Sequence, residues 1–267
     1  MDLKRISSSF IVTLALAIIL LIPNNIIVGL LFMIIAIVAL NEYFKAISKV
    51  CKPIKWVGYL SCILVAIVNF IPEQYIPVIM MFSIPFILLL LFAKVISTDM
   101  KTTFKDMAYT LLGICYIPIF MIFLSLINGM SNGKILLGYL FIAAWGTDTC
   151  AYCVGCKFGK HKFSKVSPKK SIEGCIAGIV GSVIIMLIYT SILNNYFSFE
   201  YSYFIISILG IVLSLIGQLG DFSASCIKRY VDIKDYSNLL PGHGGMLDRI
   251  DSVLFIAPFA YMLFIII

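Results

Sequence analysis

The feature that most constrains this chain is a series of apolar runs, each about as long as a helix that crosses a bilayer. Crossing about 30 Å of hydrocarbon takes about 20 apolar residues in helical form. Hydrophobic residues make up 61% of the 267 residues and charged residues 12%, about half the charged fraction of a soluble domain. The sequence therefore predicts an all-α, polytopic membrane helix bundle. About nine spans are expected, at 8–23, 26–44, 56–72, 75–93, 108–128, 135–155, 173–193, 202–220 and 251–267.

The lysines and arginines predict how these spans are oriented. Cytoplasmic loops of membrane proteins carry an excess of Lys and Arg. With a cytoplasmic N-terminus, all of the 20 basic residues except Lys134 fall in cytoplasmic segments. We therefore expect a multi-pass protein of the cell (plasma) membrane with its N-terminus in the cytoplasm. The formal net charge of +7 then reflects loops that face anionic lipid, and it does not indicate nucleic-acid binding.

Polar residues are distributed unevenly between the two parts of the chain. The spans within 1–130 contain few charges, and we interpret this part as N-terminal membrane helices. From Gly146 onward, polar groups enter the spans themselves. Charged side chains near a bilayer persist mainly for function. We therefore place the chemistry in the helices of 131–267, with the active site facing the cytoplasm.

The first candidate site residue is Asp148, near the cytoplasmic end of the sixth predicted span. A carboxylate inside a membrane span marks a functional site by default. Tyr152 follows one helical turn later on the same face. We take both as candidate substrate-binding residues. The alternative is that Asp148 only hydrogen-bonds a neighbouring helix.

A second candidate is the basic loop 157–173. Ser171 and the apolar run after it predict a helix start, and Glu173 in the first turn suits the helix dipole. Lys169 and Lys170 beside this helix N-terminus can hold phosphate groups. The alternative is a basic loop that only contacts lipid headgroups. The candidate substrate-binding residues of the loop are Ser167, Lys169, Lys170, Ser171 and Glu173.

The densest group of charges lies in 221–251. Asp221 ends the eighth predicted span, and a continued helix would place Ser225 and Lys228 on the same face. The ninth predicted helix begins with Asp248. Two helices can thus aim Asp221 and Asp248 at one point. Two carboxylates with triphosphate oxygens make a typical Mg²⁺ site.

A glycine-rich turn, Leu240-Pro241-Gly242-His243-Gly244-Gly245, lies between these two carboxylates. Glycines let the backbone amides approach a ligand closely. His243 is a metal ligand, a phosphate donor or a loop residue with a local partner, and these alternatives stay open. Carboxylates, cations and a glycine turn together indicate metal ions and phosphate groups.

The same segment carries a longer pattern. It reads Ser225-x-Ile227-Lys228-Arg229, then Lys234-Asp235-x-Ser237, then Leu240-Pro241-x-His243-Gly244-Gly245-Met246-x-Asp248-Arg249-Ile250-Asp251. This pattern resembles the signature of the phosphatidate cytidylyltransferases, also called CDP-diacylglycerol synthases. Upstream, Trp145-x2-Asp148-x2-Ala151-Tyr152 and Ser167-Pro168-Lys169-Lys170-Ser171-x-Glu173-Gly174 resemble that family too.

The resemblance covers about 145–251, whereas the first 130 residues match only in hydrophobic character. The family commonly has Thr in place of Ser171 and Trp in place of Ile172, from which we expect little consequence. Cys156 stands where the family usually has a basic residue, which weakens a phosphate-binding role at that position.

The resemblance implies transfer of CMP from CTP to phosphatidate in the membrane, giving CDP-diacylglycerol and diphosphate in phospholipid biosynthesis. It implies Mg²⁺ as cofactor and leaves a second metal ion open. The nucleophile is a phosphate oxygen that is already anionic, so positioning and charge neutralisation should carry catalysis. Metal at Asp221 and Asp248 would polarise the α-phosphate.

On this basis each candidate receives an expected role. The catalytic residues are Asp221, Lys228, Arg229, His243, Asp248, Arg249 and Asp251, with Asp221 and Asp248 as metal ligands. Ser225, Lys234, Asp235, Gly244 and Gly245 join the substrate-binding residues named above. The lysine and the two arginines are expected to hold phosphates, and Asp235 and Asp251 to orient those cations or reach metal-bound water.

Other functions stay open at this point. A CDP-archaeol synthase or a polyprenol kinase would act on another lipid through a similar site. An ion-coupled transporter would use Asp148 and Asp221 as ion sites, but transporters often have broken helices in both halves, and polar interruptions occur in only one half of this chain. A homodimer is hinted at by one G-x-x-x-G pair, Gly174 and Gly178.

Overall fold

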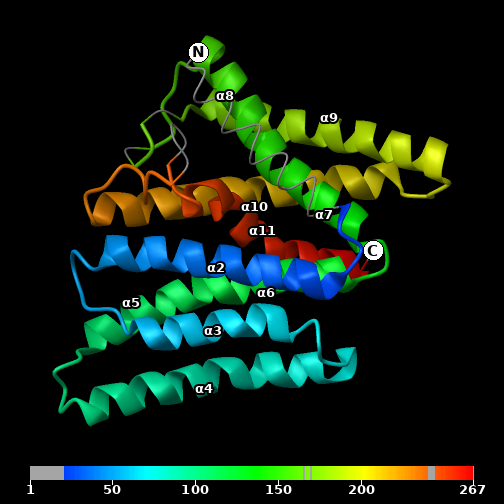
Figure 1. The fold of residues 1–267 in the computed structure, drawn as a ribbon. Helices are drawn as coiled ribbons and strands as arrows, with labels where there is room; N and C mark the ends of the chain where they lie inside the picture. Colours follow the sequence, from blue (N-terminus) through cyan, green and yellow to red (C-terminus); the bar gives the residue numbers. More distant parts are fainter. Residues whose placement is uncertain (1–20, 165, 169, 240–243, 267) are drawn as a thin grey trace. The chain divides into compact units, whose positions relative to one another are not determined.

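The computed structural model describes residues 21–164, 166–168, 170–239 and 244–266 (Figure 1). Within these ranges the regular secondary structure is helical, and the β-structure is one isolated bridge between Lys162 and Ser171. Seven of the described helices are long and apolar enough to cross a membrane, and one further apolar helix is shorter. The predicted all-α, polytopic membrane bundle is therefore confirmed. The predicted span 8–23 lies almost wholly outside the described residues.

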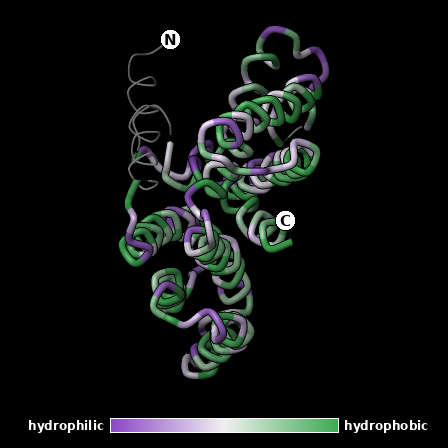
Figure 2. The backbone as a smooth tube through the Cα atoms, turned by 90° about the vertical axis from the view of Figure 1, so that its right-hand side faces the viewer, coloured by the Kyte–Doolittle hydropathy of each residue, from purple (hydrophilic) through white to green (hydrophobic). Residues whose placement is uncertain are grey.

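The described helices follow the predicted spans closely. They are α2 (Asn25–Ile47), α3 (Lys55–Ile67), η1 (Glu73–Tyr75), α4 (Ile76–Ser97), α5 (Phe104–Ile114), η2 (Cys115–Ile119), α6 (Phe120–Gly129), α7 (Gly133–Phe141), η3 (Ile142–Gly146), α8 (Thr147–Phe158), α9 (Ile172–Phe197), α10 (Tyr203–Tyr230) and α11 (Leu247–Ile266). Figure 2 shows that hydrophobic residues predominate along the helices, with hydrophilic segments mainly in the connections.

The chain forms two compact units. The first comprises Met1–Gly133 with Tyr230–Ile250, and the second comprises Lys134–Arg229 with Asp251–Ile267. The segment 230–250, which we assigned with the C-terminal helices on sequence, thus groups with the N-terminal helices. Contacts at its start explain this grouping, because the hydroxyl of Tyr109 donates to that of Tyr230 at 2.6 Å.

The first unit is built around α2, which packs against α3 and α6. Its closest helix contacts use glycines opposite aromatic rings. A Cβ at Gly58 would lie 2.5 Å from the ring of Phe44, and a Cβ at Gly113 would overlap the ring of Tyr43. The Tyr43 hydroxyl donates to the carbonyl of Tyr109 at 2.9 Å. Buried aromatic rings therefore fill the space that the glycines leave.

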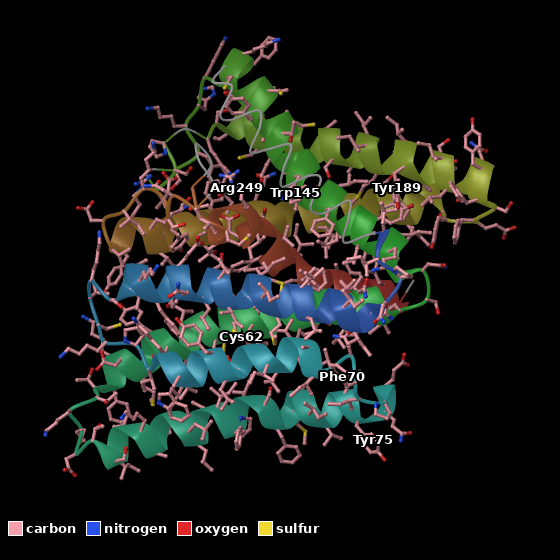
Figure 3. All side chains as sticks on the ribbon, viewed as in Figure 1. Cys62, Phe70, Tyr75, Trp145, Tyr189 and Arg249 are labelled. Carbon is pink, nitrogen blue, oxygen red and sulfur yellow. The ribbon has the colours of Figure 1, made fainter. Side chains whose placement is uncertain are left out.

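Two π-helical segments interrupt long helices. Segment η2 joins α5 to α6 and contains Pro118, which has no N–H to donate. Segment η3 joins α7 to α8 and contains Trp145, labelled in Figure 3. π-Helical turns are frequent at functional sites because they change the phase of the helix that follows. Segment η3 ends two residues before Asp148, the first candidate site residue.

In the second unit, α8 and α9 pack together through glycines of α9. A Cβ at Gly174 would lie 2.8 Å from the carbonyl oxygen of Ala151, and one at Gly178 would lie 2.8 Å from that of Thr147. Close approach of two backbones requires small residues at the interface. The glycine pair that hinted at a homodimer is therefore used within the chain, and it gives no support to a second copy.

The outer face of α9 is apolar. Ile176, Val180, Ile184, Ile188 and Ile192 are 45–58% exposed and recur every four residues. That spacing places them in one stripe along the helix. A continuous, exposed apolar stripe is what a bilayer requires of a spanning helix. The exposed stripe thus agrees with the membrane assignment.

Candidate active site

Three helices of the second unit meet at the ammonium of Lys170. Its Nζ forms an ion pair with Oδ2 of Asp221 on α10. The same Nζ lies 3.9 Å from Oδ1 of Asp148 on α8. Lys170 directly precedes Ser171, the N-cap of α9. Two carboxylates that the sequence places 73 residues apart (positions 148 and 221) therefore share one cation.

The environment of Lys170 favours its charged form. The side chain is only 22% exposed, and this burial opposes the charge. The carboxylates of Asp221 and Asp148 outweigh burial and hold the pKa of Lys170 above its ordinary value. Its Nζ also lies 4.8 Å from the centroid of the Phe222 ring, within the range of a cation–π contact.

Asp251, in the first turns of α11, adds a third carboxylate. It is buried, and it lies close enough to Asp221, Asp148 and Lys228 for their charges to act on it. Gly220 permits this proximity, because a Cβ there would lie 3.0 Å from the backbone oxygen of Asp251. We call Asp148, Lys170, Asp221, Lys228 and Asp251 the charged cluster. All five were predicted site residues, and the structure brings them together.

The loop before α9 is closed at its base. Ser171 accepts from the N–H of Gly174 at 3.1 Å, so the predicted helix start is confirmed. Glu173 accepts from the N–H of Lys160 at 3.2 Å and of His161 at 3.2 Å, and its Oε1 lies 2.6 Å from Nδ1 of His161. Glu173, expected at the substrate, thus holds the two ends of the loop together in this structure.

An aromatic stack anchors the middle of the same loop. The ring of Phe163 lies parallel to that of Phe222 on α10, with centroids 4.6 Å apart and an interplanar angle of 12°. Nε of Arg229 donates to the carbonyl of Val166 at 3.4 Å, next to the candidate Ser167. The loop is therefore attached to α10 at two points besides Lys170. No sequence pattern predicts this stack, because a stacked pair of phenylalanines has no fixed spacing.

The remaining predicted residues of the second unit lie around the charged cluster. Tyr152 is 71% exposed on α8. Ser225 is half-buried on α10, one helical turn after Asp221, and Arg229 is exposed near the end of that helix. The continued helix that we expected after Asp221 is confirmed, since α10 runs to Tyr230. Lys169 lies outside the described residues.

In the first unit, Tyr236, Gly244 and Gly245 surround the carboxylate of Asp248. Its Oδ2 accepts from the N–H of Tyr236 at 2.8 Å and from the N–H of Gly245 at 2.9 Å. Gly244 has a φ of +83°, and a Cβ there would lie 2.8 Å from the same Oδ2. Lys234 and Asp235 are exposed just before the turn, and Arg249 is half-buried after it. His243 lies outside the described residues.

One buried carboxylate in this region was missed on sequence. Glu42, on α2, is 4% exposed. It accepts from the hydroxyl of Ser237 at 2.5 Å and from the N–H groups of Met246 at 3.0 Å and Leu247 at 2.8 Å. Its signal was available, since it is a lone carboxylate in the apolar run 26–44, and charged residues in spans are rare. Glu42 is not among the predicted site residues, because the sequence places those in the part of the chain after residue 130.

The donor chemistry of the charged cluster fits a magnesium ion. Among the described residues, no three His, Cys, Asp or Glu side chains form a metal-binding group by themselves. Mg²⁺ is usually bound by one or two carboxylates together with substrate phosphates and water, so a complete protein cage is not required. Asp221 and Asp148 already share a cation. Joint binding of one ion by Asp221 and Asp248 involves residues of both units, and it stays a prediction.

Comparison with known proteins gives consistent matches. The model of the "Cytidylyltransferase family" matches residues 3–267. Phosphatidate cytidylyltransferases from Staphylococcus saprophyticus and Bacillus subtilis are each 37% identical, over 62% and 67% of this chain. These matches span 62% and 65% of the length of the two relatives. The phosphatidate cytidylyltransferase of Staphylococcus epidermidis (strain ATCC 35984) is 30% identical over 96% of both chains.

Proposed function

This chain belongs to the cytidylyltransferase family, and from that premise we propose that it transfers CMP from CTP to phosphatidate. An oxygen of the phosphatidate phosphate bonds to the α-phosphorus of CTP, and the bond from that phosphorus to the β-phosphate oxygen breaks. The products are CDP-diacylglycerol, a precursor in phospholipid biosynthesis, and diphosphate. The chain is thus a membrane-bound nucleotidyltransferase.

The observation that carries this proposal is the charged cluster. Its five members come from four different segments. Four of them were predicted from the signature or its upstream motifs, and Asp221 was predicted from its position at the end of the eighth span. An ordinary spanning helix has no use for buried carboxylates and ammonium groups, because each is costly to remove from water. A group of them held by helix packing indicates a site built for charged ligands. CTP and phosphatidate both carry several negative charges.

The residues of the site act by position and by charge. The attacking phosphate oxygen is already anionic near neutral pH, so no side chain has to remove a proton. Lys170 is held beside Asp221, and Lys228 lies near enough to Asp251 for its charge to act there. Both lysines neutralise phosphate charge as the two anionic substrates approach each other. The loop before α9 is attached to α10 through Phe163 and Arg229, and this attachment fixes the position of the candidate substrate-binding residues of the loop.

Magnesium is the expected cofactor, and Asp221 and Asp248 are its expected ligands. When bound, it supplies a positive charge that polarises the phosphate oxygens. The chain's own contribution is to present carboxylate oxygens with fixed directions. Asp248 receives that direction from two backbone N–H groups of its turn. Asp221 receives it from the Lys170 ammonium.

In this proposal the protein lies in the plasma membrane, and its active site faces the cytoplasm. The basic residues support this side, because the loop before α9 and the segment after α10 contain most of the lysines and arginines of the C-terminal half. CTP is made in the cytoplasm, whereas phosphatidate lies in the bilayer. A site at the membrane surface reaches both substrates.

The test is an assay of the purified chain in detergent with CTP labelled at the α-phosphate, Mg²⁺ and a lipid acceptor. We expect labelled CDP-diacylglycerol with phosphatidate, and no product after chelation of Mg²⁺. Parallel reactions contain an archaeal-type ether phosphatidate or a polyprenol. If product formed only with one of those lipids, that lipid and not phosphatidate would be the substrate.

A further inference from the structure

The backbone of Gly244 and Gly245, just before α11, lies beside two carboxylates, one buried and one half-buried. Asp248 belongs to the turn's own helix, whereas Glu42 comes from α2, about 200 residues earlier in the chain. Glu42 accepts from the N–H groups of Met246 and Leu247 and from the hydroxyl of Ser237. A residue of the N-terminal helices thus occupies the position of an N-cap for α11.

The chemistry of these contacts is that of a capping carboxylate. The first N–H groups of a helix have no partner within the helix, and the helix dipole favours a negative charge at this end. Three donors on one buried carboxylate compensate for its removal from water, where an unpaired charge would be costly. Glu42 therefore stabilises the start of α11 and ties it to Ser237, on the other side of the turn.

The glycines of the turn provide an independent observation. A Cβ at Gly245 would lie 2.5 Å from Oε2 of Glu42, and one at Gly244 would lie 2.8 Å from Oδ2 of Asp248. Each glycine thus leaves room for one carboxylate. The N–H of Gly245 also donates to Asp248 at 2.9 Å. The same short backbone segment contacts Glu42 on one side and Asp248 on the other.

We propose that Glu42 is a positioning residue that fixes the direction of the Asp248 carboxylate. It acts through the backbone of 244–247 and touches neither substrate nor metal. Because Asp248 is an expected ligand of Mg²⁺, this inference rests on the proposed function. It also extends the site into the N-terminal part of the chain, to which the sequence assigned no chemistry.

The first test measures backbone hydrogen exchange by mass spectrometry, in detergent and without nucleotide or metal. In Glu42→Gln, an amide nitrogen replaces one carboxylate oxygen and faces N–H groups that need an acceptor. We expect exchange in 236–248 to rise about tenfold or more, as for the loss of hydrogen bonds to a charged group. Exchange in α4 should stay unchanged. The matched control is Glu73→Gln, because Glu73 is an exposed glutamate of the same unit.

The second test measures the Mg²⁺ concentration that gives half-maximal turnover. Glu42→Gln should raise it about tenfold, with a smaller change in the KM for CTP. A generally destabilised fold would lower turnover without moving this concentration. Unchanged exchange in 236–248 together with unchanged Mg²⁺ dependence would overturn the proposal. An inactive wild type would instead overturn the proposed function, and the exchange result would still decide the role of Glu42.

A milder variant covers the case in which Glu42→Gln does not fold. Ser237→Ala removes one of the three donors to Glu42 and leaves its charge in place. Exchange in 236–248 should rise by a smaller factor than in Glu42→Gln, about threefold. Exchange equal to that of wild type in Ser237→Ala would count against the proposal.

Discussion

At the scale of single residues, Lys170 is the centre of the charged cluster. It pairs with Asp221, lies near Asp148 and rests over the ring of Phe222. In the absence of substrate, this ammonium compensates the carboxylates. In the proposed reaction, a bound triphosphate would bring additional negative charge to this cluster. Substitution of either the lysine or an aspartate should therefore change substrate or metal binding as well as local stability.

Asp221→Asn tests the metal-binding role. The amide keeps the size of the side chain and loses the charge that holds the ion. We expect turnover to fall about a hundredfold or more, since the metal contributes several kcal/mol to the transition state and each 1.4 kcal/mol is about a factor of ten. Steady-state assays at saturating CTP measure this. Asp99→Asn, at an exposed turn, is the control. Near-normal turnover of a folded Asp221→Asn protein would refute the assignment.

Lys170→Gln tests the cation of the cluster. We expect kcat/KM to fall about tenfold or more, because a charged hydrogen-bond donor to phosphate is lost. The free energy of unfolding should fall by about 1–3 kcal/mol, since a largely buried carboxylate is left without its hydrogen-bond donor. Lys101→Gln, at an exposed loop, has the same change of charge and serves as control. Equal kcat/KM in the two variants would mean that Lys170 does not contact phosphate and serves only as a basic residue of a cytoplasmic loop.

The same variant has a predicted pH dependence. The pKa of Lys170 is raised, so its contribution to stability is fully present below the unfolded pKa of about 10.4. It is lost only as the pH rises through the higher folded value. The stability difference between wild type and Lys170→Gln should therefore be constant from about pH 6 to about pH 9. Thermal unfolding across this range measures it, and a gap that closes before about pH 9 would contradict the assignment.

At the scale of elements, the packing of α8 on α9 positions the candidates of both helices. Asp148 is the second residue of α8, which directly follows η3, and Lys170 lies just before α9. Gly174 and Gly178 bring the two helix backbones into contact. A side chain at either glycine would separate the helices and move Asp148 from Lys170. Helix packing thus acts on the site without contacting a ligand.

Gly178→Ala tests this role of the helix contact. The added Cβ would lie 2.8 Å from the backbone oxygen of Thr147, so the helices must shift. We expect a loss of about 1–3 kcal/mol of stability, typical of overpacking, and lower turnover. Gly129→Ala is the matched control, because a Cβ there meets open space. Thermal unfolding in detergent measures both variants. A Gly178→Ala protein as stable as Gly129→Ala would rule out the tight contact.

The helices were predictable because apolar length is a strong signal, whereas their ends depend on local partners. We expected one span at 56–72, but α3 ends at Ile67. The side chain of Asn69 donates to the carbonyls of Val65 and Ala66, which replaces the next helical hydrogen bonds. The π-helical segments were not predicted, because their phase change leaves no mark in composition.

The candidate site was predictable where charge falls in an apolar sequence. Asp148, Asp221 and Asp251 stood out for that reason, and the structure places all three in the charged cluster. Glu42 gave the same kind of signal, but its partners are backbone N–H groups far along the chain, which no sequence pattern reveals. The stack of Phe163 on Phe222 was hidden among 20 phenylalanines. Charged residues in apolar segments therefore predicted the site, whereas contacts between residues far apart in the sequence could not be predicted.

At the scale of the whole molecule, the basic residues predict a topology that can be measured. With a cytoplasmic N-terminus and about nine spans, the C-terminus lies outside. A cysteine added after Ile267 should react with an impermeant reagent applied to intact cells. The unmodified chain, with its 8 native cysteines, gives the background. Labelling only from the cytoplasmic side would contradict this topology and would mean that the predicted number of spans is wrong by one.

The central claim is that the chain transfers the CMP group of CTP to phosphatidate. Two reactions with purified protein, phosphatidate and Mg²⁺ test it directly, one with CTP labelled at the α-phosphate and one with CTP labelled at the γ-phosphate. The account predicts the α-label in the lipid product and the γ-label in released diphosphate. Asp221→Asn protein should yield neither product. Transfer of the γ-label to lipid would identify a kinase, and no labelled lipid in either reaction would contradict the account altogether.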